Sequence, residues 1–366
     1  MSDILVAEGL TKHFPITGGF PIRRRVGAVQ AVDGIDLTVR AGESFGLVGE
    51  SGCGKSTTGR LLTRLLEPTA GRILYRGEDI TRAGRKQLAP IRSEIQMIFQ
   101  DPYSSLNPRQ TVGRIISGPM EINGIAPPGG REARVRELLE TVGLNPEHYN
   151  RFPHEFSGGQ RQRIGVARAL ALEPKVIVAD EPVSALDVSI QAQVVNLLQR
   201  LRRELGIAFL FIAHDLAVVR HFSQRVAVMY LGKIVEVGER DDIYERPRHP
   251  YTHALLSAVP EAADLGAAGE APRERIRLAG DVPSPVSPPS GCRFRTRCWK
   301  ARERCATEEP PLLRAEGSRE GHLSACHFPE PPTVARDAEV ILDPALRAAE
   351  APSGDGGPDA ASPSGD

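Results

Sequence analysis

The stretch Ser44-Phe-Gly-Leu-Val48 followed by Gly49-Glu-Ser-Gly-Cys-Gly-Lys55-Ser56 decides the fold of this chain. The apolar run predicts a short buried strand, and the glycine-rich run fits the pattern G-x-x-x-x-G-K-[ST] of a phosphate-binding loop. A helix is expected to follow from Gly54 to about Leu66 and to stop at Pro68. A strand before the loop and a helix after it are the context that separates this motif from an ordinary glycine turn.

The chemistry of such a loop assigns roles to its residues. Its glycines let backbone N–H groups surround phosphates, and the helix N-terminus adds partial positive charge. Lys55 is expected to bridge the β- and γ-phosphates of a nucleotide, and the Ser56 hydroxyl to ligate Mg²⁺. Cys53 occupies a variable position and is expected to be a bystander. The predicted nucleotide-binding residues are Gly49, Glu50, Ser51, Gly52, Cys53, Gly54, Lys55, Ser56 and Thr57.

Two carboxylates follow a second apolar run. Val176 to Ala179 predicts a buried strand, and Asp180-Glu181 stands directly after it. One carboxylate at a strand end suits a Mg²⁺ contact, and its neighbour is placed to polarise an attacking water. Two acidic residues at a strand end can also be simple solvation, but the phosphate loop upstream favours the catalytic interpretation.

The rest of residues 1–260 reads as an α/β domain. Residues 3–48 are β-rich, and Ile95 to Phe99 is a candidate buried strand. Ala208 to Ala213, like Val176 to Ala179, is a continuous apolar run typical of parallel strands covered on both faces. Helices are expected at 189–204 and 216–222. Residues 102–163 change character, with Pro/Gly-rich turns around a helix from Arg131 to Val142. This segment predicts a helical insert.

Composition excludes several classes of function. Lys+Arg and Asp+Glu balance at 46 each in 366 residues, so no net charge indicates a nucleic-acid partner. No run of eighteen or more apolar residues is present, so a membrane span is not expected. The N-terminus lacks the charged and apolar regions of a secretory signal, and a reducing cytoplasm is therefore expected.

The C-terminal part differs from the rest of the chain in amino-acid composition. Residues 261–275 read as a linker, and the prolines between 283 and 289 exclude regular structure. A cysteine-bearing segment follows within an extension expected at 261–330, and the tail at 331–366 is expected to be disordered.

Four of the five cysteines fall in this extension. Cys292, Cys298, Cys305 and Cys326 have the spacing C-x5-C-x6-C-x20-C, which matches no zinc-finger pattern. Four thiolates suit a four-cysteine iron–sulfur cluster or a tetrahedral zinc ion, of which we favour the cluster. Six nearby Arg and Lys residues would offset its negative charge. The alternative is four free, buried thiols.

Taken together, these motifs resemble those of the nucleotide-binding subunits of ABC transporters, over roughly residues 4–260. Phe156-Ser157-Gly158-Gly159-Gln160 is similar to the family's signature motif, with Phe in place of the usual Leu. Gln100 matches the Q-loop glutamine, Ser184-Ala-Leu-Asp187 the D-loop and His214 the switch histidine. Phe14 resembles the aromatic residue that stacks on adenine.

The resemblance implies a P-loop NTPase fold with a mixed sheet, and ATP and Mg²⁺ as cofactors. Gln100, Asp180 and Ser56 would serve the Mg²⁺ site, Glu181 would be the general base, and His214 would hydrogen-bond the γ-phosphate. It also implies a head-to-tail dimer, in which Ser157, Gly158, Gly159 and Gln160 of one chain complete the ATP site of a homologous ATPase subunit.

Two further stretches indicate a group within the family. Gln100-Asp-Pro-Tyr-Ser-Ser-Leu-Asn-Pro-Arg109 and His249-Pro-Tyr-Thr-His-Ala-Leu255 are similar to segments of oligopeptide and dipeptide importers, whose subunits with this cysteine spacing look like [4Fe–4S] binders. The resemblance implies two transmembrane permeases, an extracytoplasmic peptide-binding protein, and a peripheral place on the cytoplasmic face of the inner membrane. No nucleic acid is implied.

Three alternatives remain open from sequence. Nickel and some glycoside importers share the C-terminal extension, and substrate class rests on family resemblance alone. A soluble ABC ATPase of the DNA-repair or translation-factor kind would usually carry two cassettes, a long coiled coil or a basic face, and this chain has none of these. A third interpretation makes the extension an iron–sulfur sensor that regulates a process other than transport.

Overall fold

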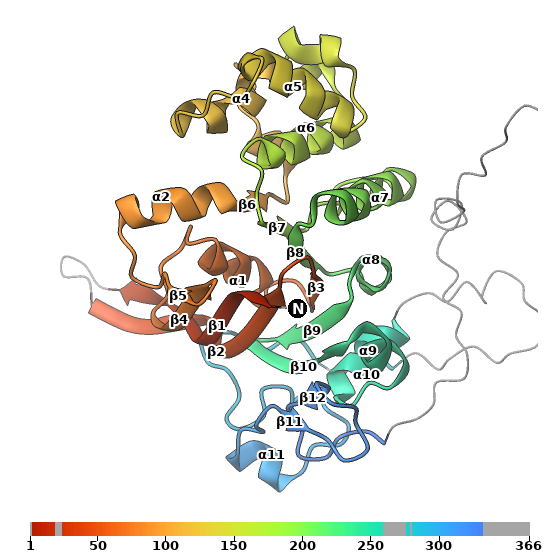
Figure 1. The fold of residues 1–366 in the computed structure, drawn as a ribbon. Helices are drawn as coiled ribbons and strands as arrows, with labels where there is room; N and C mark the ends of the chain where they lie inside the picture. The colour runs from red at the N-terminus through yellow and green to blue at the C-terminus, as the bar shows by residue number, and fades with distance from the viewer. Residues whose placement is uncertain (1, 19–23, 259–275, 279, 332–366) are drawn as a thin grey trace, which may run out of the picture.

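The computed structural model describes residues 2–18, 24–258, 276–278 and 280–331 (Figure 1). The predicted linker at 261–275 and nearly all of the predicted tail at 331–366 lie outside these residues. In the part that is described, no helix is both long and apolar enough to cross a bilayer.

The centre of the molecule is an eight-stranded mixed sheet with the order β11-β12-β10-β9-β3-β8-β7-β6. The five strands from β9 to β6 run parallel to one another, and β10, β12 and β11 are added antiparallel. This arrangement confirms the predicted mixed α/β sheet. The strands are β3 (Ser44–Val48), β6 (Ile95–Ile98), β7 (Val176–Asp180), β8 (Ala208–Ala213), β9 (Arg225–Tyr230), β10 (Lys233–Glu239), β11 (Leu313–Arg314) and β12 (Leu323–Ser324).

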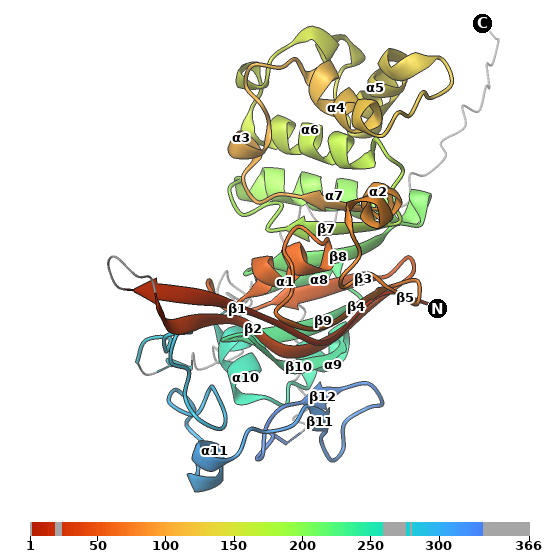
Figure 2. The ribbon, with the colours of Figure 1, turned by 90° about the vertical axis from the view of Figure 1, so that its left-hand side faces the viewer.

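A second, antiparallel sheet covers one side of the first, with the order β2-β1-β4-β5 (Figure 2). Its strands are β1 (Asp3–Gly18), β2 (Arg24–Arg40), β4 (Ala70–Tyr75) and β5 (Glu78–Asp79). The strands β1 and β2 form a long hairpin whose register shifts at several irregular positions. These shifts explain why the sequence of this part alternates only loosely.

Alternate residues of the central strands face two separate cores, as expected for strands buried on both sides. Val176 and Val178 of β7 lie in the core shared with the second sheet, whereas Ile177 and Ala179 lie in the core shared with the helices. The second sheet and the central sheet enclose helix α1 (Lys55–Leu62), whose Leu61 and Leu62 are fully buried.

Helix α1 is shorter than the sequence predicts. It ends at Leu62 rather than Leu66, because Arg64 takes a left-handed backbone with φ of 53° and the N–H groups of Leu65 and Leu66 both turn back to the Arg60 carbonyl. Leu65, which the predicted helix includes, is half exposed. Helix α2 (Arg85–Glu94) follows after β5.

The other face of the central sheet carries α7 (Val188–Leu205) and α8 (Leu216–Phe222). Beyond it lies a helical layer at the top of Figure 1, between β6 and β7 in the chain. Its helices are α3 (Pro102–Ser105), α4 (Val112–Ile122), α5 (Gly130–Thr141), η1 (Pro146–Asn150), η2 (Pro153–Glu155) and α6 (Gly158–Leu170). Helix α6 continues past residue 163, where the sequence-based insert was expected to end.

The C-terminal extension lies at the opposite end of the molecule (Figure 1). After α9 (Arg240–Glu245) and α10 (Pro250–Ser257), its described part contains α11 (Glu303–Thr307), β11 and β12. The fully buried Glu236 of β10 joins the two parts, because its carboxylate accepts bonds from the backbone N–H groups of Arg248 and His249 and contacts Nε2 of His322. The proline-rich run near 283–289 has no helix or strand.

Candidate active site

The phosphate loop runs from the end of β3 to the start of α1, and two of its glycines are required by close backbone contacts. A Cβ on Gly49 would lie 2.1 Å from the Met229 carbonyl oxygen, and one on Gly54 would lie 2.1 Å from the Ala31 carbonyl oxygen. Gly54 has φ of 112°, which side chains of L-residues rarely allow. The loop is therefore fixed between β9 and β2, with the N-terminus of α1 open toward the phosphate position.

Lys55 spans the loop from inside. Its ammonium donates to the carbonyl oxygens of Gly49 at 2.7 Å and Glu50 at 2.9 Å, and the residue is almost fully buried. Cys53, predicted to be a bystander, has a buried thiol beside this ammonium, and burial raises the pKa of that thiol. The lysine is thus held near the middle of the loop, where a bound phosphate would compete for its protons.

Ser56 meets Asp180 across the gap between α1 and β7. The Ser56 hydroxyl donates to Oδ1 of Asp180 at 2.7 Å. Burial raises the pKa of Asp180, and the bond from Ser56 partly offsets that effect. A hydroxyl and a carboxylate at this distance are the kind of oxygen ligands that hold Mg²⁺ together with substrate phosphates. The residues present therefore fit a magnesium ion.

Glu181 lies one residue further along and is approached by both predicted partners. Nε2 of Gln100 donates to Oε2 of Glu181 at 2.8 Å, and Nδ1 of His214 lies 3.4 Å from the same oxygen. Glu181 has φ of 46°, a left-handed conformation that is uncommon outside glycine. Its side chain is 12% exposed, whereas that of His214 is 55% exposed. The structure thus brings together a shielded carboxylate and two polar side chains at the carboxyl ends of β6, β7 and β8.

The segment Ser157–Gln160 lies elsewhere, at the start of α6 in the helical layer (Figure 1). The Ser157 side chain accepts from the Gln160 N–H, and the Gln160 side chain accepts from the Ser157 N–H, which forms a capping box. A Cβ on Gly159 would lie 2.3 Å from the Ile190 side chain of α7. Ser157 itself is exposed.

Phe14 lies on β1 and pairs with Val29 of β2. Two residues further along β2 is Ala31, whose carbonyl oxygen packs against Gly54. Lys12 places its ammonium 5.1 Å from the Phe14 ring centroid. Phe14 is half-buried, so one part of its ring remains accessible.

Sequence reasoning missed two residues that hold the loop from the C-terminal side. The Tyr251 hydroxyl accepts from the Glu50 N–H at 2.9 Å. Arg297 donates to both carboxylate oxygens of Glu50, at 2.8 and 3.2 Å. These partners lie about two hundred residues or more away from the loop in sequence, and no local pattern could have revealed them.

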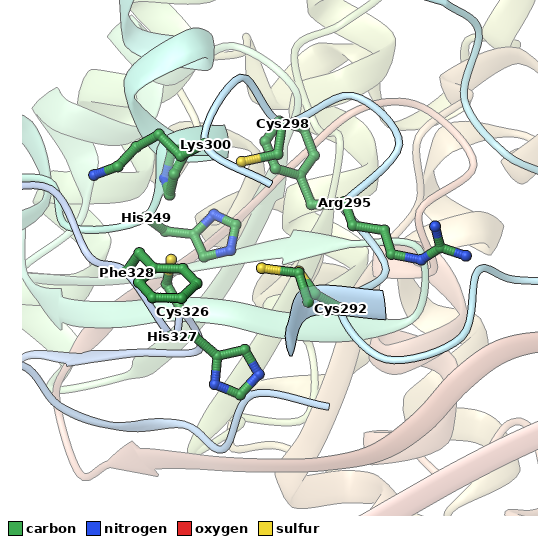
Figure 3. A pocket seen from close by; sticks show the side chains of 11 residues that line it. His249, Cys292, Arg295, Cys298, Lys300, Cys326, His327 and Phe328 are labelled. Atoms are coloured by element: carbon green, nitrogen blue, oxygen red, sulfur yellow. The ribbon is translucent and has the colours of Figure 1, made fainter. Parts of the chain in front are cut away.

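The four late cysteines line one small cavity together with His249, Phe294 and Phe328. Figure 3 shows Cys292, Cys298 and Cys326 around the same space. Burial raises the pKa of Cys292 to about 11 and that of Cys326 to about 12. As the side chains stand, no group of three or more His, Cys, Asp or Glu in the described ranges forms a site that could hold a metal ion. The four donors thus share a cavity, but they do not converge on a mononuclear ion.

Comparisons with known proteins agree with this geometry. Residues 32–184 match the ABC transporter family, and residues 235–305 match the C-terminal region of oligopeptide/dipeptide transporters. The chain is 51% identical to the oligopeptide transport ATP-binding protein AppF of Bacillus subtilis, over 89% of this chain and 97% of that protein. It is 56% identical to the putative oligopeptide transport ATP-binding protein YkfD of the same organism, over 82% and 90% of the two chains.

A solved structure supports the fold. The ATP-binding cassette MJ0796, in a dimeric post-hydrolysis state bound to ADP and Pi, matches with a TM-score of 0.57 at 28% identity, over 65% of this chain and 99% of that one. The chain therefore belongs to the ATP-binding subunits of ABC transporters, is an ABC ATPase, and falls within the group that carries the oligopeptide/dipeptide transporter C-terminal region.

Proposed function

We propose that this protein hydrolyses ATP to energise the import of di- and oligopeptides through a membrane ABC transporter. One observation carries the hydrolytic part: Gln100, Asp180, Glu181 and His214 gather at the strand ends beside Ser56 of the phosphate loop. Relatives named as oligopeptide transport ATP-binding proteins, and the matching C-terminal region, support the substrate class.

In this proposal Glu181 is the general base. Gln100 and His214 both contact Oε2 of Glu181, so they orient the carboxylate. Oε1 of Glu181 is then left to accept a proton from the attacking water. His214 is exposed enough to reach a γ-phosphate in the cleft, and Lys55 neutralises charge on the phosphates. Phosphoryl transfer depends mainly on such positioning and charge stabilisation.

Ser56 and Asp180 would hold the magnesium ion. Gln100 would respond to that ion through its hydrogen bond to Glu181, the residue after Asp180. Magnesium held there would supply positive charge against the charge that develops on the phosphates. Burial raises the pKa of Asp180, and a divalent ion held there would favour the charged form of this carboxyl. Phe14 is proposed to pack on the adenine ring.

We further propose that Ser157, Gly158, Gly159 and Gln160 act on the nucleotide of a homologous ATPase subunit. Ser157 is exposed at the N-terminus of a helix, where a phosphate would be bound favourably. Two of the matching structures, both of the cassette MJ0796, are described as dimeric. Two permeases and an extracytoplasmic binding protein would complete the complex, with this subunit peripheral on the cytoplasmic face of the membrane.

For the extension we propose a [4Fe–4S] cluster on Cys292, Cys298, Cys305 and Cys326. Four thiols line the cavity, together with His249, His327, Arg295 and Lys300. A tetrahedral zinc ion needs its four sulfurs roughly 3.8 Å apart, as Zn–S bonds of about 2.3 Å require. A polynuclear cluster binds each thiolate to a different iron, which suits donors around a common space better. We assign residues 1–260 to the ATPase domain and 261–330 to this extension.

The transport proposal is tested by purification from membranes together with the permeases encoded beside the gene, followed by reconstitution in proteoliposomes. Peptides delivered by the cognate binding protein should stimulate ATP hydrolysis several-fold, while nickel or glycosides should not. Stimulation by nickel or a glycoside would move the protein to another importer group. A purely soluble protein that never co-purifies with permeases would contradict transport.

The cluster is tested by anaerobic purification and analysis for iron, acid-labile sulfide and zinc. About four irons and four sulfides per chain are expected, with loss of both in Cys298→Ser and no loss in Cys53→Ser. Zinc alone would overturn the cluster proposal.

A further inference from the structure

The C-terminal extension makes a direct ionic contact with the phosphate loop. Arg297 forms a two-bond pair with the Glu50 carboxylate, and the exposed fractions of the two side chains are 9% and 26%. A guanidinium that meets both oxygens of a carboxylate fixes orientation as well as charge. This pair links the second residue of the loop to the residue directly before Cys298.

Glu50 is fixed at all three of its polar groups. Its side chain is held by Arg297, its N–H donates to the Tyr251 hydroxyl at 2.9 Å, and its carbonyl oxygen accepts from Lys55 at 2.9 Å. Tyr251 is itself fully buried and packs on Tyr230 and Phe294. The Lys55 ammonium is therefore held in part by a residue whose side chain and N–H both bond to the C-terminal part of the chain.

A second arginine of the extension supports the same loop from the other side. Arg293 donates to the Leu231 carbonyl oxygen and pairs with Asp33 of β2. The next residue, Gly232, donates its N–H to the Cys53 carbonyl oxygen at 2.8 Å. Arg293 follows Cys292, and Arg297 precedes Cys298, so both contacts start from one short segment.

We infer that Arg297 is a positioning residue for ATP binding, which acts through Glu50 to hold the phosphate loop and Lys55 in their binding geometry. The inference rests on the proposed role of the loop in binding ATP. Without Arg297, the Glu50 side chain loses its two bonds to the extension. Part of the binding energy of ATP must then be used to order the loop. The loss falls mainly on ATP affinity, because the groups around Glu181 are not touched.

The experiment compares Arg297→Met, Arg297→Lys, Glu50→Gln and the double variant Arg297→Met/Glu50→Gln in the full-length chain. Titration with a fluorescent ATP analogue gives affinity, and phosphate release gives KM and kcat. We expect about a tenfold rise in Kd and KM for Arg297→Met and for Glu50→Gln, with kcat within twofold of the parent. The Kd and KM of Arg297→Lys should lie between those of the parent and those of Arg297→Met, because lysine keeps the charge but cannot bond to both carboxylate oxygens as a guanidinium does.

The double variant should bind ATP no more weakly than either single variant, since both single changes remove one interaction. The exposed pair Arg304–Glu308 in the same extension is the matched control, and neither Arg304→Met nor Glu308→Gln should change KM. Melting curves show whether each variant is folded, and Arg297→Lys serves where Arg297→Met does not fold.

Two results would overturn the inference: unchanged KM in both Arg297→Lys and Glu50→Gln, or additive effects in the double variant. Failure of the underlying ATP site would look different. In that case Lys55→Ala would bind the ATP analogue as well as the parent, whereas failure of the inference alone leaves Lys55→Ala unable to bind.

Discussion

The two glycine-rich elements of this chain differ in how much of their surroundings the chain itself supplies. The loop Gly49–Ser56 is enclosed by β2, β9, α10 and the extension, and its lysine is buried. The segment Ser157–Gln160 satisfies its own N–H groups by a capping box and presents an exposed serine. The contrast indicates that the loop is preorganised within one subunit, and it agrees with the proposal that the second element acts on another subunit's nucleotide.

The largest expected effect comes from Glu181→Gln, which removes the proposed base without changing the enclosure of the loop. Steady-state phosphate release should fall by about 10²- to 10⁴-fold, the usual contribution of general base catalysis. ATP affinity should stay within twofold, because Lys55 and Ser56 are unchanged. Normal turnover in this variant would refute the assignment of Glu181.

Ser157→Arg tests whether the second element acts in another subunit. The exposed serine allows the larger side chain without unfolding, yet the arginine would block approach of a partner nucleotide. We expect hydrolysis by the assembled ATPase pair to fall about 10²-fold, similar to the loss of one transition-state donor. ATP should still bind to the variant chain itself. Lys55→Ala is the contrasting variant, because it should lose both binding and hydrolysis.

Within the loop, the glycines are expected to differ in their tolerance of a methyl group. Gly54→Ala should cost about 3 kcal/mol or more, because positive φ adds to a contact of 2.1 Å with the Ala31 carbonyl oxygen. Gly52→Ala should cost about 1 kcal/mol, since nothing lies within 4 Å of its Cβ position and only φ of 78° is strained. Chemical denaturation measures both, and equal costs would contradict the enclosure described above.

The last expected effect concerns stability in acid and involves His249 at the N-terminus of α10. His249 caps α10 by accepting from the Tyr251 N–H, and burial lowers the pKa of His249 from 6.5 to about 4, with Glu236 offsetting part of the effect. As pH falls, His249 is therefore protonated in the unfolded state before it is protonated in the folded state. This contribution to the free energy of unfolding is complete above pH 6.5 and is lost as pH drops toward 4, by roughly 3 kcal/mol at most.

His249→Asn keeps a capping oxygen and removes the titrating group. Its melting temperature should therefore fall less between pH 7 and pH 4.5 than that of the parent. His253→Asn is a suitable control, because His253 contacts the Pro247 carbonyl oxygen and does not cap the helix. Equal slopes for the His249→Asn variant and the parent would show that the acid sensitivity arises elsewhere.

The sequence predicts the helices and strands of the candidate active site better than the long-range contacts that hold its phosphate loop. The phosphate loop, the strand ending in Asp180 and the helices 189–204 and 216–222 follow local patterns of glycine, apolar periodicity and strand length, and the structure places elements there. The end of α1 was predicted four residues too late, because apolar spacing continued past the left-handed turn at Arg64. The Glu50–Arg297 pair and the bond from the Glu50 N–H to Tyr251 join distant parts of the chain, and such contacts leave no mark in a local sequence window.

The pairing of β12 with β10 makes the extension part of the same sheet that carries the phosphate loop. A chain cut near residue 260 would expose the free edge of β10 and leave the Glu236 carboxylate without its His322 partner. Unpaired strand edges recruit strands from other molecules. Truncated chains are therefore expected to aggregate, so that the extension protects the sheet from self-association as well as holding the loop.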